Sequence, residues 1–234
     1  MVHQRLAAAV FLMLFVGLTR PSVGTAQGTP TTQDTPEIQA LRERAANGDL
    51  IAQFNLGRMY ADGRGVPQDD AHAVAWYRKA ADQGLATAQN NLGVMYDNGQ
   101  GVSEDDARAV AWYRRAAGQG LADAQFNLGR MYTGGQAVPQ DDAQAVAWYR
   151  KAADQGYAGA QFNLGVAYAD GRGVPEDYVE AHKWMNLAAS RVSGADLTQY
   201  TEALDTLAKQ MSPAQIADAQ ERARVWQPAE QKTP

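Results

Sequence analysis

The 234-residue chain contains no cysteine, so disulfide bonds, thiolate metal sites and a cysteine nucleophile are excluded. Histidine is scarce, and His3, His72 and His182 are far apart in the sequence. The sequence also has no Gly-x-Ser-x-Gly elbow and no His-Glu-x-x-His motif. We therefore expect no catalytic site, no metal site and no cofactor.

Basic residues are fewer than acidic ones. The chain carries 21 Lys and Arg against 26 Asp and Glu, a formal net charge of −5. Nucleic-acid-binding proteins usually present a basic stripe to the phosphate backbone, and none is visible here. Nucleic acid is therefore not an expected partner.

Long hydrophobic runs are limited to the N-terminus. Arg5 precedes an apolar run over residues 6–18, and Gly24-Thr25-Ala26 offers a cleavage site of small residues. A membrane span needs about 20 apolar residues, so this shorter run favours a cleavable signal peptide at 1–26 over a retained anchor. A disordered leader over 27–35 is expected to follow. The sequence thus predicts a periplasmic or secreted protein, with no stable membrane insertion once the signal is cleaved.

The most informative feature present is a repeat of 36 residues. Tryptophan recurs at that interval, and so do a glutamine, a glycine and a tyrosine. A fixed period in this range is typical of stacked helical arrays. The recurring residues are Trp76, Trp112, Trp148 and Trp184; Gln53, Gln89, Gln125 and Gln161; Gly57, Gly93, Gly129 and Gly165; Tyr60, Tyr96, Tyr132 and Tyr168.

Each unit predicts two helices joined by a loop. Apolar residues at helical spacing from Leu50 to Tyr60 predict a first helix, helix A, and the Gly- and Pro-rich stretch 62–68 predicts the loop. Asp69 and its counterparts Asp105, Asp141 and Asp177 are suited to cap a second helix, helix B. Glu180, three residues after Asp177, predicts a capping box, as does Gln144 after Asp141. Gly84 is expected to end helix B in a left-handed conformation.

Gly57 is costly inside a helix, by about 1 kcal/mol relative to alanine. Its recurrence in all four units indicates a close approach between the paired helices, with the Trp and Tyr of helix B packing over the gap. These recurring residues are therefore explained by stacking rather than by chemistry.

The fold predicted is an all-α, right-handed α-solenoid of stacked antiparallel helix pairs. We expect a capping helix at 36–48, capped by Thr35, and four repeats at 49–84, 85–120, 121–156 and 157–192. C-terminal capping helices are expected at 193–227 and a disordered tail at 228–234. In the last repeat Val192 replaces the terminal glycine, so helix B is expected to stop at Gly194.

The pattern Ala-Gln-Phe-Asn-Leu-Gly-x-Met-Tyr-x-x-Gly-x-Gly-Val-Pro-x-Asp, followed by Ala-x-x-Trp-Tyr-Arg-Lys-Ala-Ala, resembles the Sel-one-like repeat. That family is related to the tetratricopeptide repeat and has a longer loop between its two helices. The resemblance covers about residues 37–226. It implies a protein-binding scaffold or adaptor, and it places helix A on the concave face of the stack.

Positions that vary between repeats are the candidate partner-binding residues. They lie on one side of helix A, away from the stripe that carries Leu56 and Tyr60. Two readings remain open: the row binds an apolar and acidic peptide or helix of a partner, or its phenylalanines pack against the next helix A. The row comprises Phe54, Asn90, Phe126 and Phe162; Arg58, Val94, Arg130 and Val166; Asp62, Asn98 and Asp170.

We therefore expect an exported protein–protein interaction scaffold or adaptor that binds an envelope or extracellular protein through its concave face. The sequence does not indicate the oligomeric state. Two other classes stay open. A glycan or peptidoglycan binder would need exposed aromatic residues on the concave face. A β-lactamase-like hydrolase is suggested for some cysteine-rich members of the family, but this chain lacks cysteine.

One repeat breaks the loop pattern. Three loops read Gly-x-Gly, but the second glycine is replaced by Ala137 in the third repeat. If that position needs a positive φ, alanine is strained there by about 1–2 kcal/mol.

Overall fold

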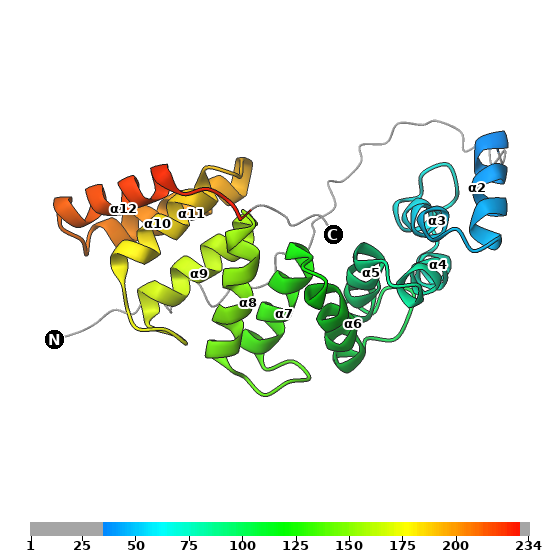
Figure 1. Cartoon of the computed structure of the whole chain (residues 1–234), viewed down its shortest axis with the longest axis horizontal. Helices are drawn as coiled ribbons and strands as arrows, with labels where there is room; N and C mark the ends of the chain where they lie inside the picture. The colour runs from blue at the N-terminus through cyan, green and yellow to red at the C-terminus, as the bar shows by residue number, and fades with distance from the viewer. Residues whose placement is uncertain (1–34, 230–234) are drawn as a thin grey trace.

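The computed structural model describes residues 35–229, and this part of the chain is entirely helical apart from its loops. The predicted signal peptide 1–26, nearly all of the leader 27–35 and the last five residues of the tail lie outside the described residues. The helices follow one another along an arc from α2 to α12 (Figure 1). They are α2 Pro36–Ala46, α3 Leu50–Asp62, α4 Asp70–Asp82, α5 Ala86–Asp97, α6 Asp106–Gly118, α7 Ala122–Gly134, α8 Asp142–Asp154, α9 Ala158–Asp170, α10 Tyr178–Ala189, α11 Gly194–Ala208 and α12 Pro213–Val225.

The all-α solenoid predicted from the repeat is confirmed. Helices α3, α5, α7 and α9 are the four helices A, and α4, α6, α8 and α10 are their partners, the helices B. Helices α4, α6 and α8 also each pack against the helix A that follows. Between residues 35 and 229, no helix combines the length and the apolar character needed to cross a membrane.

The predicted aspartate caps are present at every helix B. Asp69, Asp105 and Asp141 each accept a hydrogen bond of 2.9 Å from the backbone N–H three residues on. Asp177 accepts from the N–H groups of Val179 and Glu180. These carboxylates satisfy backbone donors at the starts of the helices B.

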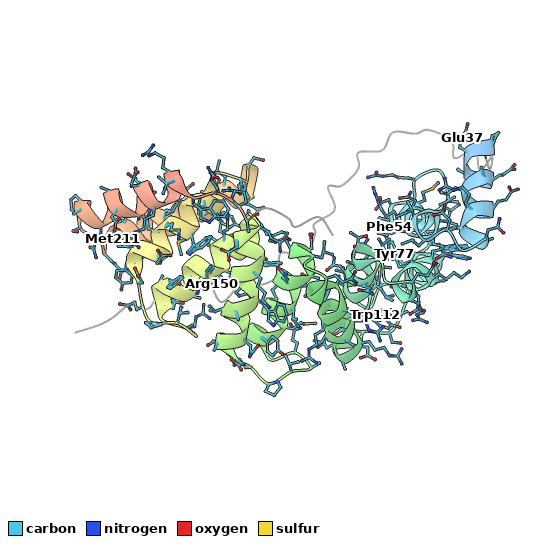
Figure 2. The ribbon with its side chains drawn as sticks, in the orientation of Figure 1. Glu37, Phe54, Tyr77, Trp112, Arg150 and Met211 are labelled. Carbon is cyan, nitrogen blue, oxygen red and sulfur yellow. The ribbon has the colours of Figure 1, made fainter. Side chains whose placement is uncertain are left out.

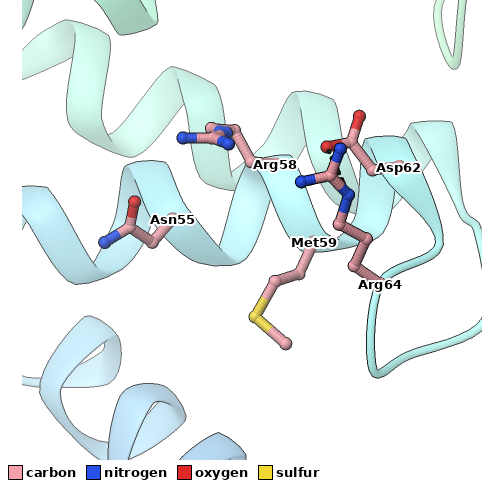
Figure 3. Close-up of a pocket in the computed structure, with 5 residues that line it drawn as sticks. All are labelled: Asn55, Arg58, Met59, Asp62 and Arg64. Carbon is pink, nitrogen blue, oxygen red and sulfur yellow. Dashed lines mark ion pairs between the residues drawn. The ribbon is translucent and has the colours of Figure 1, made fainter.

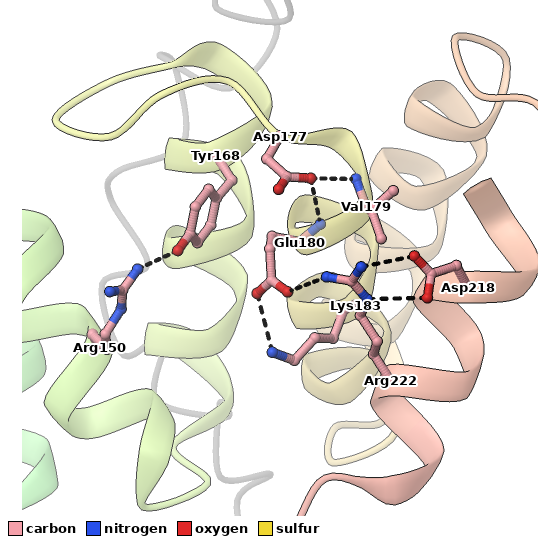
Figure 4. A network of polar contacts seen from close by, with 8 residues as sticks. All are labelled: Arg150, Tyr168, Asp177, Val179, Glu180, Lys183, Asp218 and Arg222. Carbon is pink, nitrogen blue, oxygen red and sulfur yellow. Dashed lines mark hydrogen bonds and ion pairs between the residues drawn. The ribbon is translucent and has the colours of Figure 1, made fainter.

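The capping boxes predicted at Gln144 and Glu180 are wrong, because the backbone N–H groups of Asp141 and Asp177 donate to Tyr132 and Tyr168 instead. The Glu180 carboxylate accepts from Lys183 and from Arg222 of α12, both at 3.0 Å (Figure 4). Arg222 also pairs with Asp218 at 2.8 Å. Because α12 packs against α10, Glu180 joins these two helices and does not cap the start of α10. Within residues 35–229, the capping box that forms joins Ser212 and Gln215.

The close approach predicted at the helix A glycines is confirmed. A Cβ atom added to Gly93 would lie 2.7 Å from the ring of Tyr113, which is shorter than real Cβ contacts. The same holds for Gly57 beside Tyr77 at 2.7 Å (Tyr77 is labelled in Figure 2). The tyrosine alone fills this gap. The neighbouring tryptophans of the first three repeats are half-buried, and a cation covers each ring, as Lys79 does over Trp76 at 4.1 Å.

The recurring glutamines join successive repeats. The side-chain amide of Gln89 donates to the carbonyl oxygen of Ala81 in the preceding helix B at 3.1 Å. Its Oε1 accepts from Gln119, at the end of its own helix B, at 2.8 Å. Gln53 with Gln83 and Gln125 with Gln155 repeat this second bond. Burying a fully bonded amide stabilises the stack and fixes its register.

The last repeat departs from this ladder. Gln161 is fully buried and donates to Ala153 at 3.1 Å, but its Oε1 has no hydrogen-bond partner among residues 35–229. The position that would supply one holds Arg191, whose guanidinium donates to Leu187 and lies over the Trp226 ring. The repeat pattern therefore gives way where the C-terminal helices begin.

Both ends of the array are closed by helices outside the repeats. Thr35 caps α2 as predicted, and Arg42 of α2 donates to Tyr60 of α3, as Arg114 of α6 does to Tyr132 of α7. Helix α2 thus stands in the place of a helix B. At the other end, α11 and α12 both pack against α10.

The expected stop of α10 at Gly194 is wrong. The helix ends at Ala189, and Gly194 begins α11 instead. Ser190 and Arg191 donate side-chain hydrogen bonds to the Leu187 carbonyl oxygen at 2.7 and 2.9 Å. This carbonyl in the last turn is therefore satisfied without a left-handed glycine.

Ala137 has a φ of +53°, and it is the one non-glycine residue with a positive φ in the described part of the chain. The matching Gly101 and Gly173 have φ of +68° and +70°. A Cβ at Gly101 would come within 2.3 Å of the Asp70 backbone. Ala137 has a Cβ atom where the matching loops have glycine. The loop of the third repeat must therefore lie farther from the preceding helix B, α6, than the matching loops lie from theirs.

We predict that Ala137→Gly raises the thermal midpoint. Relief of left-handed strain outweighs the entropy that glycine adds to the unfolded chain, for a net gain of up to about 1 kcal/mol. Gly101→Ala is the matched control and should lower the midpoint by more, because backbone atoms must move. Amide exchange over residues 131–142 should also be faster than in the other loops. A lowered midpoint for Ala137→Gly would contradict this account.

Candidate functional site

The structure divides the eleven residues of the candidate row by exposure. Arg58, Asp62 and Asn98 are exposed. Five are half-buried: Phe54, Val94, Phe126, Arg130 and Asp170. Asn90, Phe162 and Val166 are buried, with 8%, 4% and 6% of their surface exposed. The exposed members of the row therefore lie in the first two repeats, whereas those of the third and fourth are half-buried or buried.

Phe162 and Val166 are corrected as binding candidates because the C-terminal helices cover them. The ring of Phe162 stacks on that of Tyr200 in α11, with centroids 4.1 Å apart and an interplanar angle of 9°. Both residues belong to one buried cluster with Leu207 and Met211. No repeat pattern relates α9 to α11, so this cover was not predicted from the sequence.

The other two phenylalanines contribute to packing as well. Phe54 lies against Tyr77 with ring centroids 5.8 Å apart (Figure 2), and Phe126 lies against Tyr149 at 5.9 Å. Phe126 also meets Tyr157, at the start of the next helix A, at 5.0 Å. These contacts favour the reading in which the phenylalanines pack within the stack.

The acidic members of the row are paired inside the chain. Asp62 lies 3.4 Å from Arg64 and Asp170 lies 3.2 Å from Arg172, each within one loop. Burial raises the pKa of the Asp170 carboxyl, and the nearby Arg172 opposes that rise. These carboxylates orient loop arginines rather than standing alone as acidic points.

A polar cluster that the sequence reading missed links the second and third repeats. The Tyr113 hydroxyl donates to Asp97 at 3.1 Å, and Arg130 of α7 approaches the same carboxylate at 3.9 Å. Burial raises the pKa of Asp97, while Arg130 and the Tyr113 hydrogen bond act to lower it. The sequence does contain a sign of this cluster, because Asp97 is the one acidic residue at a repeat position that otherwise holds Ala61, Thr133 and Ala169.

A second contact joins the same two helices. The Asn127 amide of α7 donates to the Oδ1 atom of Asn90 in α5 at 3.1 Å. Asn90 is thus a bridging residue rather than an exposed contact point. Asn127 was not among the predicted site residues, and an asparagine recurs at its position in every repeat.

The first repeat has an open hollow on α3. It encloses about 250 Å³ and is lined by Asn55, Arg58, Met59, Asp62 and Arg64 (Figure 3). In Figure 3 the Met59 side chain points away from α3 into this opening. Two arginines beside a thioether form a surface suited to an apolar group flanked by acid. Among residues 35–229, no three His, Asp or Glu side chains are grouped to hold a metal ion.

The raised pKa of Asp97 predicts a pH-dependent stability. A carboxyl whose pKa is higher in the folded state stabilises the fold most when it is protonated, and this contribution is lost as the pH rises through the folded pKa. Asp97→Asn removes the titration and still leaves an oxygen to accept from Tyr113. The stability of the variant relative to the natural chain should therefore rise between about pH 4 and pH 7.

Thermal unfolding at several pH values measures this difference. Asp123→Asn, at an exposed carboxylate on α7, is the control and should show a flatter difference. A relative stability of Asp97→Asn that falls with pH would show that the attraction of Arg130 outweighs burial.

Comparison with known proteins identifies the repeat. The family model described as Sel1 repeat matches four consecutive stretches, at residues 50–85, 86–121, 122–157 and 158–192. No curated protein matches the chain.

Two solved structures are similar over most of the chain. A protective antigen present in uropathogenic Escherichia coli strains, which displays an SLR fold, is 37% identical, with a TM-score of 0.74. The match covers 80% of this chain and 40% of the antigen. A Sel1 repeat protein from Oxalobacter formigenes is 40% identical, with a TM-score of 0.62, over 70% of this chain and 48% of that one. This chain therefore spans less than half the length of either protein.

The four matched stretches cover more than half of the chain, and their helix pairs carry the recurring glycine, tyrosine and glutamine contacts described above. The chain belongs to the Sel1 repeat family.

Proposed function

We propose that the chain is an exported scaffold that binds an envelope or extracellular protein through the exposed part of the helix A face. Sel1 repeat solenoids are commonly protein-interaction scaffolds and are typically not catalytic. The observation that carries the proposal is that each repeat has two kinds of position, constant ones that stack and variable ones on helix A. Stacking residues stay constant, while one helix A position changes character from the exposed Arg58 to the half-buried Val94 and Arg130.

Export is part of the proposal. The apolar run over residues 6–18 and the small residues at 24–26 support a cleaved signal, with a mature chain that begins near Gln27. The similar solved array from uropathogenic E. coli is a protective antigen, which is in keeping with an exported chain.

The two other classes receive no support from the geometry. A glycan platform needs exposed aromatic rings, whereas Phe54 and Phe126 are half-buried against tyrosines and Phe162 is buried. A hydrolase needs an activated nucleophile, and the polar cluster around Asp97 has a tyrosine hydroxyl and an arginine committed to one carboxylate. We therefore propose a binding function without catalysis.

Site-specific photo-cross-linking in the producing cells tests this proposal. A photoreactive residue at Arg58 or Asn98 should yield a protein adduct, because both positions are exposed on the helix A side. Ala75 and Ala111, exposed on helices B, are the matched controls and should yield none. Adducts from the controls alone would contradict the proposed face. Mass spectrometry of the adduct also identifies the N-terminal residue of the mature chain. A chain that retains residues 1–26 would contradict cleavage of the signal peptide.

A further inference from the structure

Helices α3 and α7 carry the same nine residues at their centres. Residues 52–60 and residues 124–132 both read AQFNLGRMY. Identical helices at the same position of the repeat offer identical side chains to whatever precedes them in the stack. Helix α7 is preceded by α5, whereas α3 has no helix A before it within residues 35–229.

The contacts of α7 show what this surface binds. Asn127 donates to the amide oxygen of Asn90, and Arg130 faces the carboxylate of Asp97, both on α5. The two α5 residues are seven positions apart, two helical turns, and so lie on one side of that helix. The complement of the shared sequence is therefore a helix with an amide oxygen at one position and a carboxylate two turns later.

On α3 the equivalents of Asn127 and Arg130 are Asn55 and Arg58, and both line the open hollow (Figure 3). Arg58 is exposed, and its guanidinium lies 6.0 Å from the Phe54 ring. Met59 is half-buried, while the matching Met95 and Met131 are only 5% and 1% exposed. Met59 packs in part against the cluster of Ala45, Ala52 and Leu56, so helix α3 leaves accessible the polar part of this surface and one side of Met59.

We infer that a helix of a protein partner docks on α3 in the place that α5 takes on α7, with a carboxylate in its last turn paired to Arg58. The partner residue two turns earlier offers an amide oxygen to Asn55, and an apolar side chain between them meets Met59. This inference rests on the proposed protein-binding function and names the chemistry of the partner.

A second copy of this chain does not fit as the occupant. The carboxylate required at this position occurs in α5 alone of the four helices A, since the matching residues are Ala61, Thr133 and Ala169. In a folded copy Asp97 already faces Arg130 and accepts from Tyr113, and its side chain is 8% exposed. The α5 surface therefore already makes its contacts within each molecule and is not available to a second copy.

A helix-stabilised peptide with the sequence of residues 86–98 is the probe, because it carries the α5 surface itself. Binding to the whole chain is followed by the methyl signal of Met59 in a sample with isotope-labelled methionine. The Met59 signal should move on titration. Arg58→Ala should weaken binding at least about tenfold, through loss of a charge-assisted contact.

The matched variant is Arg130→Ala, which removes the same residue from the same nine-residue sequence where α5 already covers it. It should leave peptide affinity within about twofold, since that surface is internal to the array. Arg58→Asp should restore binding to a peptide that carries Asp97→Arg. Because Arg58 is exposed, Arg58→Ala and Arg58→Asp should keep the far-UV circular dichroism of the natural chain.

Three results would overturn the inference: no movement of Met59 at millimolar peptide, equal binding by Arg58→Ala, or binding that requires removal of residues 1–34. The last would make the N-terminal segment of this chain the occupant. Protein adducts at Asn98 without peptide binding would overturn the docked helix and leave the scaffold function standing. Peptide binding with an adduct at Arg58 but none at Asn98 would count against the wider face and support α3 alone.

Discussion

The stack depends on the contact between the helix A glycine and the ring that crosses it. A Cβ at Gly57, Gly93 or Gly129 would lie 2.6–2.7 Å from the facing tyrosine, and at Gly165 it would lie 2.7 Å from Met185. Glycine lets the two helices approach until the buried ring fills the space between them. The other recurring features, from the aspartate caps to the glutamine ladder, hold in place a helix pair whose spacing this contact sets.

Polar bonds then define how one pair sits on the next. A glutamine from each helix A reaches the carbonyl of the preceding helix B and accepts from the glutamine that ends its own, while arginines such as Arg114 reach a tyrosine of the following helix A. The helix A glutamines are buried, so leaving one of their amide groups unpaired would cost about 1–3 kcal/mol. The unpaired Oε1 of Gln161 shows the cost accepted where the last repeat meets the C-terminal helices.

Sequence alone predicted what is local or periodic. The caps at Asp69 and its counterparts, the tight approach at Gly57 and the positive φ at Ala137 each follow from residue type at a fixed place in the repeat. The misses involve the non-repeating end and contacts between repeats. Phe162 and Glu180 have partners in α11 and α12, whose placement no periodicity encodes. The Asp97–Arg130 contact was missed because it joins helices A of different repeats, although the solitary acid at that position was visible.

The proposed partner recognition rests on side chains that stacking leaves exposed. Most side chains that recur from repeat to repeat take part in stacking, so we assign specificity to the few helix A positions that differ. On α3, Arg58 is exposed and Met59 is half-buried beside the open hollow.

The central claim is tested most directly by unfolding Gly93→Ala beside Gly118→Ala. Alanine exceeds glycine in helix propensity by about 1 kcal/mol, and a Cβ at Gly118 meets no atom within 4 Å. The account predicts that Gly118→Ala leaves stability unchanged or raises it, whereas Gly93→Ala lowers it by more than the propensity gain because Tyr113 must move. Equal or greater stability for Gly93→Ala would contradict the claim that the glycine–tyrosine contact sets the spacing of the helix pair.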